Sequence, residues 1–226
     1  MNDQLNDIAE LMYDSIDSGN IEEVKKLLDA GVSVQITYDY YHTSPLHTAA
    51  CNDQFEIAKL LIERGADIHM KTEFGYTPLY SALSLSLSLK ETDERVKLTD
   101  TMKLLIEHGA DIHETDARGL TILMHAAGSS NSQNIKMIKI LIDMGLRTDV
   151  TDDHGNNLIH LLASKYYCNN VHNQDNQFKL IELFLSCGVD MNAKNNEGLT
   201  PLAISVKNKK YEIVRFLIDC GGKFDI

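Results

Sequence analysis

The stretch Ser44-Pro45-Leu46-His47-Thr48-Ala49-Ala50 has the residues of a helix start, and it decides how the rest of the chain is interpreted. A serine at the N-cap can accept a backbone N–H bond, and a proline at the first helical position loses only an N–H that no helix would pair. The two other prolines lie in Thr77-Pro78-Leu79-Tyr80 and Thr200-Pro201-Leu202-Ala203, where each again follows a hydroxyl residue and precedes an apolar one. We therefore expect three helices to begin at these sites.

Glycines divide the chain at regular intervals. Each ends an amphipathic stretch such as Leu60-Leu61-Ile62-Glu63-Arg64, and glycine adopts the left-handed conformation that ends many helices without strain from a Cβ atom. The six glycines are Gly31, Gly65, Gly109, Gly145, Gly188 and Gly221. Their spacings of 34, 44, 36, 43 and 33 indicate a unit of about 33 residues, with insertions in two units.

Apolar residues keep the same register in every unit. The residue four positions before each glycine is apolar, and so is the residue two positions after each helix cap. The first set is Leu27, Leu61, Leu105, Leu141, Phe184 and Leu217, and the second is Leu46, Leu79, Leu123, Ile159 and Leu202. We expect these residues to form the core between two helices of each unit.

This pattern of a hydroxyl residue, Pro, Leu and His, then small residues, a second helix and Gly-Ala-Asp, closely resembles the ankyrin repeat. It is clearest in residues 44–50 leading to Gly65-Ala66-Asp67-Ile68-His69, and Gly109-Ala110-Asp111-Ile112-His113 closes the next unit. A tetratricopeptide array has a similar period, but its signature includes a tryptophan, and this chain has none.

The resemblance implies an all-α protein: an ankyrin repeat solenoid of about six helix-turn-helix units with hairpin-like finger loops. We expect a single domain over residues 1–226. Its units would be 1–37 as the N-terminal cap, 38–71, 72–115, 116–151, 152–194 and 195–226 as the C-terminal cap.

Two units are longer than the others between their helices. The third inserts about eleven residues that begin with Leu83-Ser84-Leu85-Ser86-Leu87-Ser88-Leu89, and the fifth inserts about ten around Tyr166-Tyr167-Cys168-Asn169-Asn170. Alternating Leu and Ser is typical of a strand, but here it directly follows a helix cap within a helical unit. We favour extended helices near residues 83–99 and 164–177, and a surface loop is the alternative.

The composition fits a soluble globular protein, with 43% hydrophobic and 24% charged residues. The 21 basic and 33 acidic residues give a net charge of −12, and a surface so negative repels phosphate backbones and anionic lipid. We therefore expect neither nucleic acid nor a membrane as partner. The N-terminus lacks the pattern of a signal peptide, and no apolar run approaches the roughly 20 residues that span a bilayer, so we expect a cytoplasmic protein that is monomeric when free.

Nine histidines and four cysteines raise the question of a metal site. His69 and His113 both follow Gly-Ala-Asp-Ile, and His47 and His160 stand at the helix start, where the resemblance implies a structural histidine. The chain has no Cys-x-x-Cys pair, whereas a structural zinc site needs four converging ligands. We expect no metal site and no cofactor.

The cysteines are expected to be free thiols, and no catalytic motif is present. Cys187 and Cys220 share one register in adjacent units, so about one repeat separates them, more than the Cα separation of up to about 7 Å that a disulfide spans. The sequence has no phosphate-binding glycine loop, no His-Glu-x-x-His and no Gly-x-Ser-x-Gly. Asp152-Asp153-His154-Gly155 fits a finger turn in this register. We therefore expect that the protein is not an enzyme.

The resemblance implies that the loops between units project as fingers, whose tips and adjoining concave helix face bind partners. Aromatic residues gather on the first two tips, 39–43 and 72–76, and aromatic and arginine side chains are enriched at interface hot spots. Some of these rings could instead fold back onto the next finger, and His42 replaces the usual glycine. The partner-binding residues predicted on the fingers are Tyr40, Tyr41, His42, Phe74, Tyr76, Arg118 and Leu120.

Acidic residues form a stripe along the expected first helix. Asp3, Asp7, Glu10, Asp14 and Asp17 repeat at spacings of four and three, which places them on one face. The stripe could be a solvated capping face, or it could dock a basic partner and accelerate its association. On the second interpretation, Asp7, Glu10 and Asp14 are predicted to bind the partner.

Together with the resemblance, these features predict a module that binds another protein, basic in character, and inhibits or sequesters it, for example as an immunity protein for a toxin. The alternatives are a translocated or viral ankyrin protein that acts on a host target, and a scaffold or adaptor.

Overall fold

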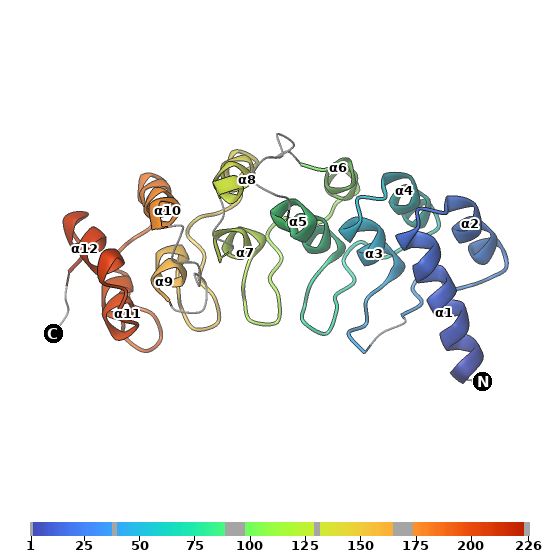
Figure 1. Cartoon of the computed structure of the whole chain (residues 1–226), viewed down its shortest axis with the longest axis horizontal. Coiled ribbons are helices and arrows are strands. Elements are labelled where there is room, and N and C mark those ends of the chain that lie inside the picture. Colours follow the sequence, from blue (N-terminus) through green and yellow to red (C-terminus); the bar gives the residue numbers. More distant parts are fainter. Residues whose placement is uncertain (1, 38–39, 89–97, 129–131, 165–173, 224–226) are drawn as a thin grey trace. The chain divides into compact units, whose positions relative to one another are not determined.

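The computed structural model describes residues 2–37, 40–88, 98–128, 132–164 and 174–223, and these ranges contain twelve helices and no extended strand. The expected all-α architecture is therefore confirmed. The chain divides into two compact units, and among the described residues the first unit ends at Ala117 and the second begins at Arg118. Figure 1 labels the helices along the chain.

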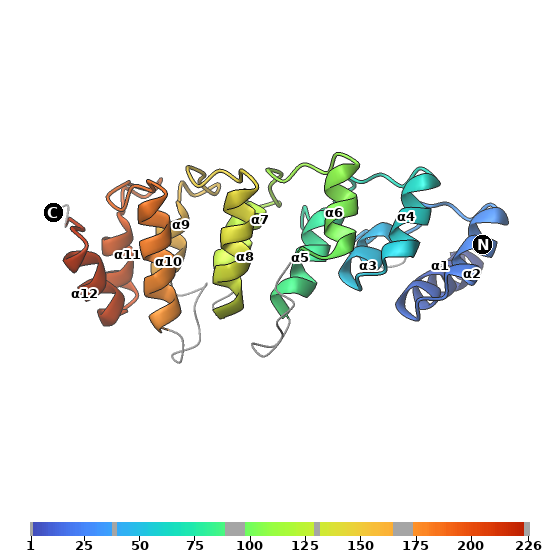
Figure 2. The ribbon, with the colours of Figure 1, turned by 90° about the horizontal axis from the view of Figure 1, so that it is seen from above.

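In the first unit, helices alternate between two layers. Helix α3 packs against both α1 and α5 in one layer, while α4 packs against α2 and α6 in the other (Figure 2). Each helix also contacts its sequence partner, so that α1 pairs with α2, α3 with α4 and α5 with α6. The helices span Asn2–Asp17 (α1), Ile21–Asp29 (α2), Pro45–Cys51 (α3), Phe55–Glu63 (α4), Pro78–Ser88 (α5) and Asp100–Glu107 (α6).

The second unit has the same arrangement. Helix α9 packs against α7 and α11 in one layer, and α10 packs against α8 and α12 in the other. The helices span Ile122–Gly128 (α7), Ser132–Asp143 (α8), Leu158–Ala163 (α9), Gln174–Ser186 (α10), Pro201–Lys207 (α11) and Tyr211–Asp219 (α12).

The three helices predicted at the prolines begin where expected. Ser44 is the N-cap of α3 and Thr200 is the N-cap of α11, where its hydroxyl accepts the amide of Ala203 at 3.2 Å. Helix α5 begins at Pro78. Proline at the first helical position leaves no amide unpaired there, which explains why the three short motifs identify helix starts so well.

The six glycines predicted to end helices are all left-handed, with φ between 84° and 98°. The apolar residues in register with them are buried, except that Leu27 is only half-buried. Burying a leucine side chain contributes roughly 1.5 to 3 kcal/mol, so this repeated register makes a substantial contribution to the core of each unit.

The insertions lengthen some helices and not others. Helix α5 has 11 residues where α3 and α11 have 7, and α10 has 13 where α4 and α12 have 9. Helix α9, however, has only 6 residues, so the expected extension falls on one helix of each pair. The rest of both insertions, residues 89–97 and 165–173, lies outside the described residues.

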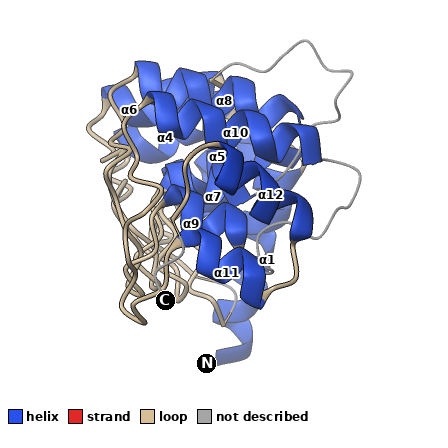
Figure 3. Ribbon diagram, turned by 90° about the vertical axis from the view of Figure 1, so that its left-hand side faces the viewer, coloured by secondary structure: helices blue, strands red, loops and turns tan. Residues whose placement is uncertain are grey.

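In each unit, the loops that lead from one helix pair to the next lie on one side of the helices (Figure 3). They are the fingers predicted from the sequence, and their tips carry the candidate site.

Candidate functional site

The second finger shows how the sequence builds a rigid tip. The amide of Thr72 donates to the Tyr76 carbonyl at 3.0 Å, and the Thr72 hydroxyl accepts the Tyr76 amide at 3.1 Å. Gly75 completes the turn with φ of 80°, which glycine adopts without a Cβ penalty. In the first finger, His42 holds the equivalent left-handed conformation with φ of 56°, and its side chain is exposed.

Backbone hydrogen bonds join the fingers of the first unit. The amide of Glu73 donates to the Tyr41 carbonyl at 2.8 Å, and the amide of Ala117 donates to the Phe74 carbonyl at 2.9 Å. Two tip residues with exposed rings, Tyr41 and Phe74, are thus fixed through their main chain. Their relative position is set by the fold before any partner binds.

Five aromatic rings form a continuous aromatic patch across the first two fingers and the start of α5. Successive ring centroids are 6.0, 5.1, 5.8 and 4.0 Å apart. The first three distances lie within the range of about 4.5 to 7 Å that favours aromatic pairs, and the last pair is closely stacked. The three outer rings are exposed, at 80%, 47% and 49% in chain order. The rings of the aromatic patch are, in order, Tyr40, Tyr41, Phe74, Tyr76 and Tyr80.

The inner end of the aromatic patch differs from the sequence prediction. Tyr76 was expected at an exposed tip, but its ring is half-buried and stacks on Tyr80 at an interplanar angle of 15°. The reason is that Tyr76 directly precedes Thr77, from which the chain enters α5, so its ring folds back over the new helix. Tyr80 was not predicted at all, although its spacing of four from Tyr76 across a helix start is a usable signal.

Two buried histidines at helix starts each bond to a backbone carbonyl of the next finger. The Nδ1 atom of His47 accepts the amide of Ser44 at 3.2 Å, and its Nε2 atom donates to the Tyr76 carbonyl at 2.9 Å. His160 repeats this arrangement with the amide of Asn157 at 3.2 Å and the Leu199 carbonyl at 3.0 Å. Burial lowers the pKa of His160. The structural role predicted for the two histidines is confirmed.

Further polar contacts brace the fingers of the first unit. The Tyr13 hydroxyl, from α1, donates toward the carbonyls of Ile36, at 3.1 Å, and Thr43, at the two ends of the first finger. The Tyr13 side chain thus connects the first finger to α1.

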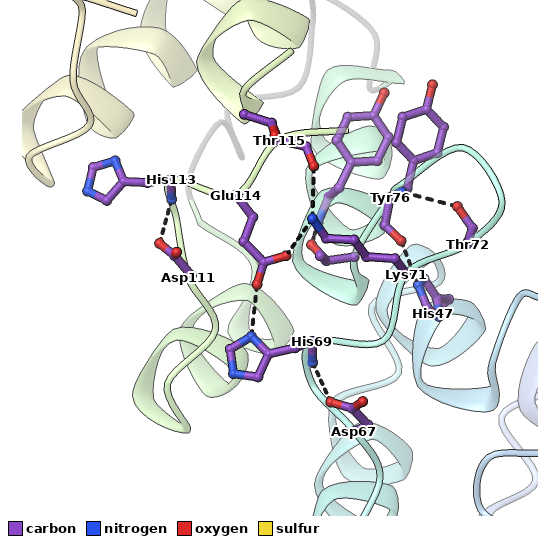
Figure 4. A network of polar contacts seen from close by, with 12 residues as sticks. His47, Asp67, His69, Lys71, Thr72, Tyr76, Asp111, His113, Glu114 and Thr115 are labelled. Carbon is purple, nitrogen blue, oxygen red and sulfur yellow. Dashed lines mark hydrogen bonds and ion pairs between the residues drawn. The ribbon is translucent and has the colours of Figure 1, made fainter. Parts of the chain in front are cut away.

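Glu114 links the second finger to the next loop of the first unit. Its carboxylate lies 2.9 Å from His69 Nδ1 and 3.3 Å from Lys71 Nζ, which also donates to the Thr115 carbonyl at 3.0 Å (Figure 4). The amides of His69 and His113 donate to the aspartates two residues earlier at 2.9 and 2.8 Å, a shared loop geometry that accounts for their shared register.

The acidic stripe lies on the outer surface of α1. Asp7, Glu10 and Asp14 are exposed, and the side chain of Asp3 lies outside the described residues. Asp17 is also exposed, but its carboxylate accepts a hydrogen bond from the Asn52 amide group at 2.7 Å. The predicted residues of the stripe are therefore accessible.

The two predicted residues of the third finger belong to the second unit. Arg118 is exposed and lies at the edge of a groove of about 680 Å³. Leu120 was predicted to contact a partner, and this needs correction, because its side chain is only 2% exposed and forms part of the core. Like Tyr76, it directly precedes an N-terminal hydroxyl residue, Thr121, and turns inward. The groove is lined also by side chains of the fourth and fifth fingers, among them His154, Glu197 and Leu199.

Within the described ranges, no group of three or more His, Cys, Asp or Glu side chains could hold a metal ion. Cys51, Cys187 and Cys220 are free thiols as expected, and Cys168 lies outside the described residues. Burial raises the pKa of the Cys51 thiol, and the Asp17 carboxylate raises it further.

Comparison with known proteins agrees with the repeated geometry. A family model described as ankyrin repeats (3 copies) matches residues 11–90, 94–173 and 170–226. The chain belongs to the ankyrin repeat family. Proteins of this family bind other proteins, and their repeats are typically not catalytic. None of the described helices is long and apolar enough to cross a membrane.

Solved ankyrin structures resemble the whole chain at low sequence identity. An ankyrin repeat domain from Acinetobacter baumannii AYE matches with a TM-score of 0.66 and 21% identity, over 94% of this chain and 98% of that one. A chain in the complex of the Bd0816 predatory endopeptidase from Bdellovibrio bacteriovorus with the immunity protein Bd3460 matches with a TM-score of 0.66 and 19% identity, over 92% and 97%. At such identities, the likeness establishes the fold.

Two sequence relatives match shorter stretches. Protein phosphatase 1 regulatory subunit 27 of Mus musculus is 38% identical over 77 residues, which is 33% of this chain and 48% of the relative. The putative ankyrin repeat protein FPV228 of Fowlpox virus is 34% identical over 93 residues, 38% of this chain and 18% of the relative. The chain thus matches less than half the length of these curated relatives.

Proposed function

We propose that this ankyrin repeat protein binds a partner protein through the aromatic patch and thereby inhibits or sequesters it. The observation that carries the proposal is the continuous run of rings on two adjacent fingers, with Tyr40, Tyr41 and Phe74 largely exposed. Rings exposed to this extent add little to the core, whereas aromatic side chains are strongly enriched at interface hot spots.

The fixed position of the tips favours tight binding. Binding costs free energy wherever side chains or loops must be ordered, and a preorganised surface avoids part of that cost. Here the carbonyls of Tyr41 and Phe74 accept hydrogen bonds from the neighbouring fingers, and tyrosine and phenylalanine have few rotatable bonds.

An inhibitory role is supported by the fold that this chain shares with a chain in the endopeptidase and immunity protein complex. The relative from Fowlpox virus supports the alternative of a protein that acts on a host target. A scaffold would need a second binding surface, and the groove of about 680 Å³ in the second unit is a candidate for one.

The chain is proposed to act as a cytoplasmic monomer when free and to meet a basic partner. The acidic stripe supports this partner chemistry, because exposed carboxylates attract a positively charged surface during encounter. Its contribution would be to the rate of association, while the aromatic patch would control dissociation.

Affinity capture from the native organism, followed by binding kinetics, tests this function. Tyr41→Ala and Phe74→Ala should each weaken binding to the captured partner by about 1 to 4 kcal/mol, mainly through faster dissociation. Tyr211→Ala is the matched control, since Tyr211 is 71% exposed but lies on α12 in the second unit. If neither ring truncation changes dissociation, the aromatic patch is not the binding site. One stoichiometric partner favours inhibition, and many substoichiometric ones favour a scaffold.

A further inference from the structure

The charge of the chain is distributed very unevenly between its two parts. Residues 1–117 contain 22 acidic and 9 basic residues, a formal net charge of −13, whereas residues 118–226 contain 11 acidic and 12 basic residues, a net charge of +1. Among the described residues, the boundary between these two parts is also the boundary between the compact units. The aromatic patch therefore lies on a strongly acidic unit, whereas the other unit is almost neutral.

One tip of the aromatic patch also carries an acidic residue. Glu73 immediately precedes Phe74, its side chain is exposed, and its amide donates to the Tyr41 carbonyl at 2.8 Å. The rings of Phe74, the next residue, and of Tyr41, whose carbonyl accepts this bond, have centroids 5.1 Å apart and are tilted by 31°. Among the described residues, Glu73 forms no ion pair, and the lysine two positions earlier, Lys71, is paired with Glu114.

Exposed aromatic rings together with an unpaired carboxylate favour a guanidinium group over other side chains. The face of an aromatic ring attracts a cation, and a planar guanidinium group can stack on it while its N–H groups donate to a carboxylate. An ammonium group is compact and strongly hydrated, so it gains less from the flat surface. An apolar side chain over the same rings would partly desolvate Glu73 without pairing it, which is unfavourable. A second copy of this chain would bring two units of like charge together.

We propose that the aromatic patch recognises an arginine side chain of the partner protein, with the guanidinium stacked on Tyr41 and Phe74 and hydrogen-bonded to Glu73. This inference rests on the proposed function and adds the chemistry of the partner. It makes Glu73, which the sequence did not single out, a specificity-determining residue of the interface.

The test uses the full chain and three capped glycine peptides, which carry two arginines, two lysines or two leucines. Titrations followed by NMR of the aromatic ring signals should give the tightest binding for the arginine peptide. Phe74→Leu should weaken that binding by about 2- to 30-fold, the range of a cation–π contact. Glu73→Gln should weaken it by about 2- to 5-fold, the range of an exposed charge pair.

Matched controls come from the second unit, where Tyr211 is 71% exposed and is followed by the exposed Glu212. Tyr211→Leu and Glu212→Gln likewise replace an exposed aromatic and an exposed acidic residue, but in a nearly neutral unit, and they should leave binding of the arginine peptide unchanged. Each variant is first checked for an unchanged melting temperature.

Three results would overturn the inference: equal affinity for the arginine and lysine peptides, tighter binding of the leucine peptide, or equal losses in the control variants. The proposed function fails in a different way. If dissociation of the captured partner is unchanged in Phe74→Ala, the patch is not the interface. If that dissociation is faster but the peptides show no arginine preference, the interface stands and the arginine assignment falls.

Discussion

The contact between neighbouring fingers can be tested by placing a single methyl group at Gly75. A Cβ atom at this position would lie 2.4 Å from the amide nitrogen of Ala117 and 2.8 Å from the carbonyl carbon of Asp116. Both atoms belong to the backbone of the next finger, so no change of rotamer can relieve the clash. Gly75→Ala should therefore push the two fingers apart and break the hydrogen bond between the Ala117 amide and the Phe74 carbonyl.

The expected magnitude has two parts. Gly75 has φ of 80°, and a residue with a Cβ atom in that region costs about 1 to 2 kcal/mol. Loss of the bond to Phe74 adds about 0.5 to 1.5 kcal/mol, and more if the buried backbone groups stay unpaired. Gly198 supplies the control, because its φ is 76° but nothing lies within 4 Å of a Cβ atom built there. Gly198→Ala should show the first part alone.

Urea unfolding of the two variants, read by circular dichroism, separates these parts. Gly75→Ala should destabilise the protein by about 0.5 to 1.5 kcal/mol more than Gly198→Ala does, which is the second part alone. The same substitution should also weaken binding of the partner to the aromatic patch, since Phe74 lies on the displaced finger. Equal destabilisation by the two substitutions would refute the reasoning, because it would mean that the fingers do not pack as tightly as the distances indicate.

Three other predictions concern the core, the histidines and the acidic stripe. Leu105→Ala removes a fully buried side chain and should cost about 2 to 5 kcal/mol in unfolding free energy, and a much smaller loss in urea unfolding would contradict its place in the core. Because burial lowers the pKa of His160, the unfolded chain binds that proton more readily, so stability should be complete above about pH 6.5 and fall as the pH drops below it. The fall in urea midpoint between pH 7.5 and 5.5 should be smaller in His160→Gln, and an equal fall in both proteins would count against this assignment. Replacing Asp7, Glu10 and Asp14 together by their amides should slow association with the captured partner and reduce its salt dependence, with dissociation nearly unchanged; a change confined to dissociation would contradict a steering role.

The helices were predictable because their start and end signals are local. Pro45, Pro78 and Pro201 each begin a helix, and Gly65 and its equivalents each end one. Proline fixes its own φ near the helical value and glycine readily adopts a positive φ, so both signals act without distant neighbours. The insertions were less predictable. Alternating leucine and serine supports a helix or a strand by pattern alone, and the structure extends α5 to Ser88 without a matching extension of α9.

The candidate site was predictable where side chains point outward and not where they turn back. Tyr41 and Phe74 were found from composition and register, whereas Tyr76 and Leu120 were assigned to the surface although they pack inward. Both precede a helix N-cap, a position from which apolar side chains often contact the first turn. The contact between His69 and Glu114 joins residues 45 positions apart, so no local pattern could reveal it.

The hydrogen bond from His47 to the Tyr76 carbonyl means that a fragment of the chain keeps the second finger in place only if it also contains the preceding repeat. The second finger depends on a side chain that belongs to the preceding helix pair, 29 residues earlier. A fragment that starts after α3 would retain Phe74 and Tyr76 but lose the His47 imidazole that donates to the Tyr76 carbonyl. A shortened chain can therefore keep the exposed ring of the second finger and still lack a working surface, so the binding surface is best compared between proteins by pairs of adjacent repeats.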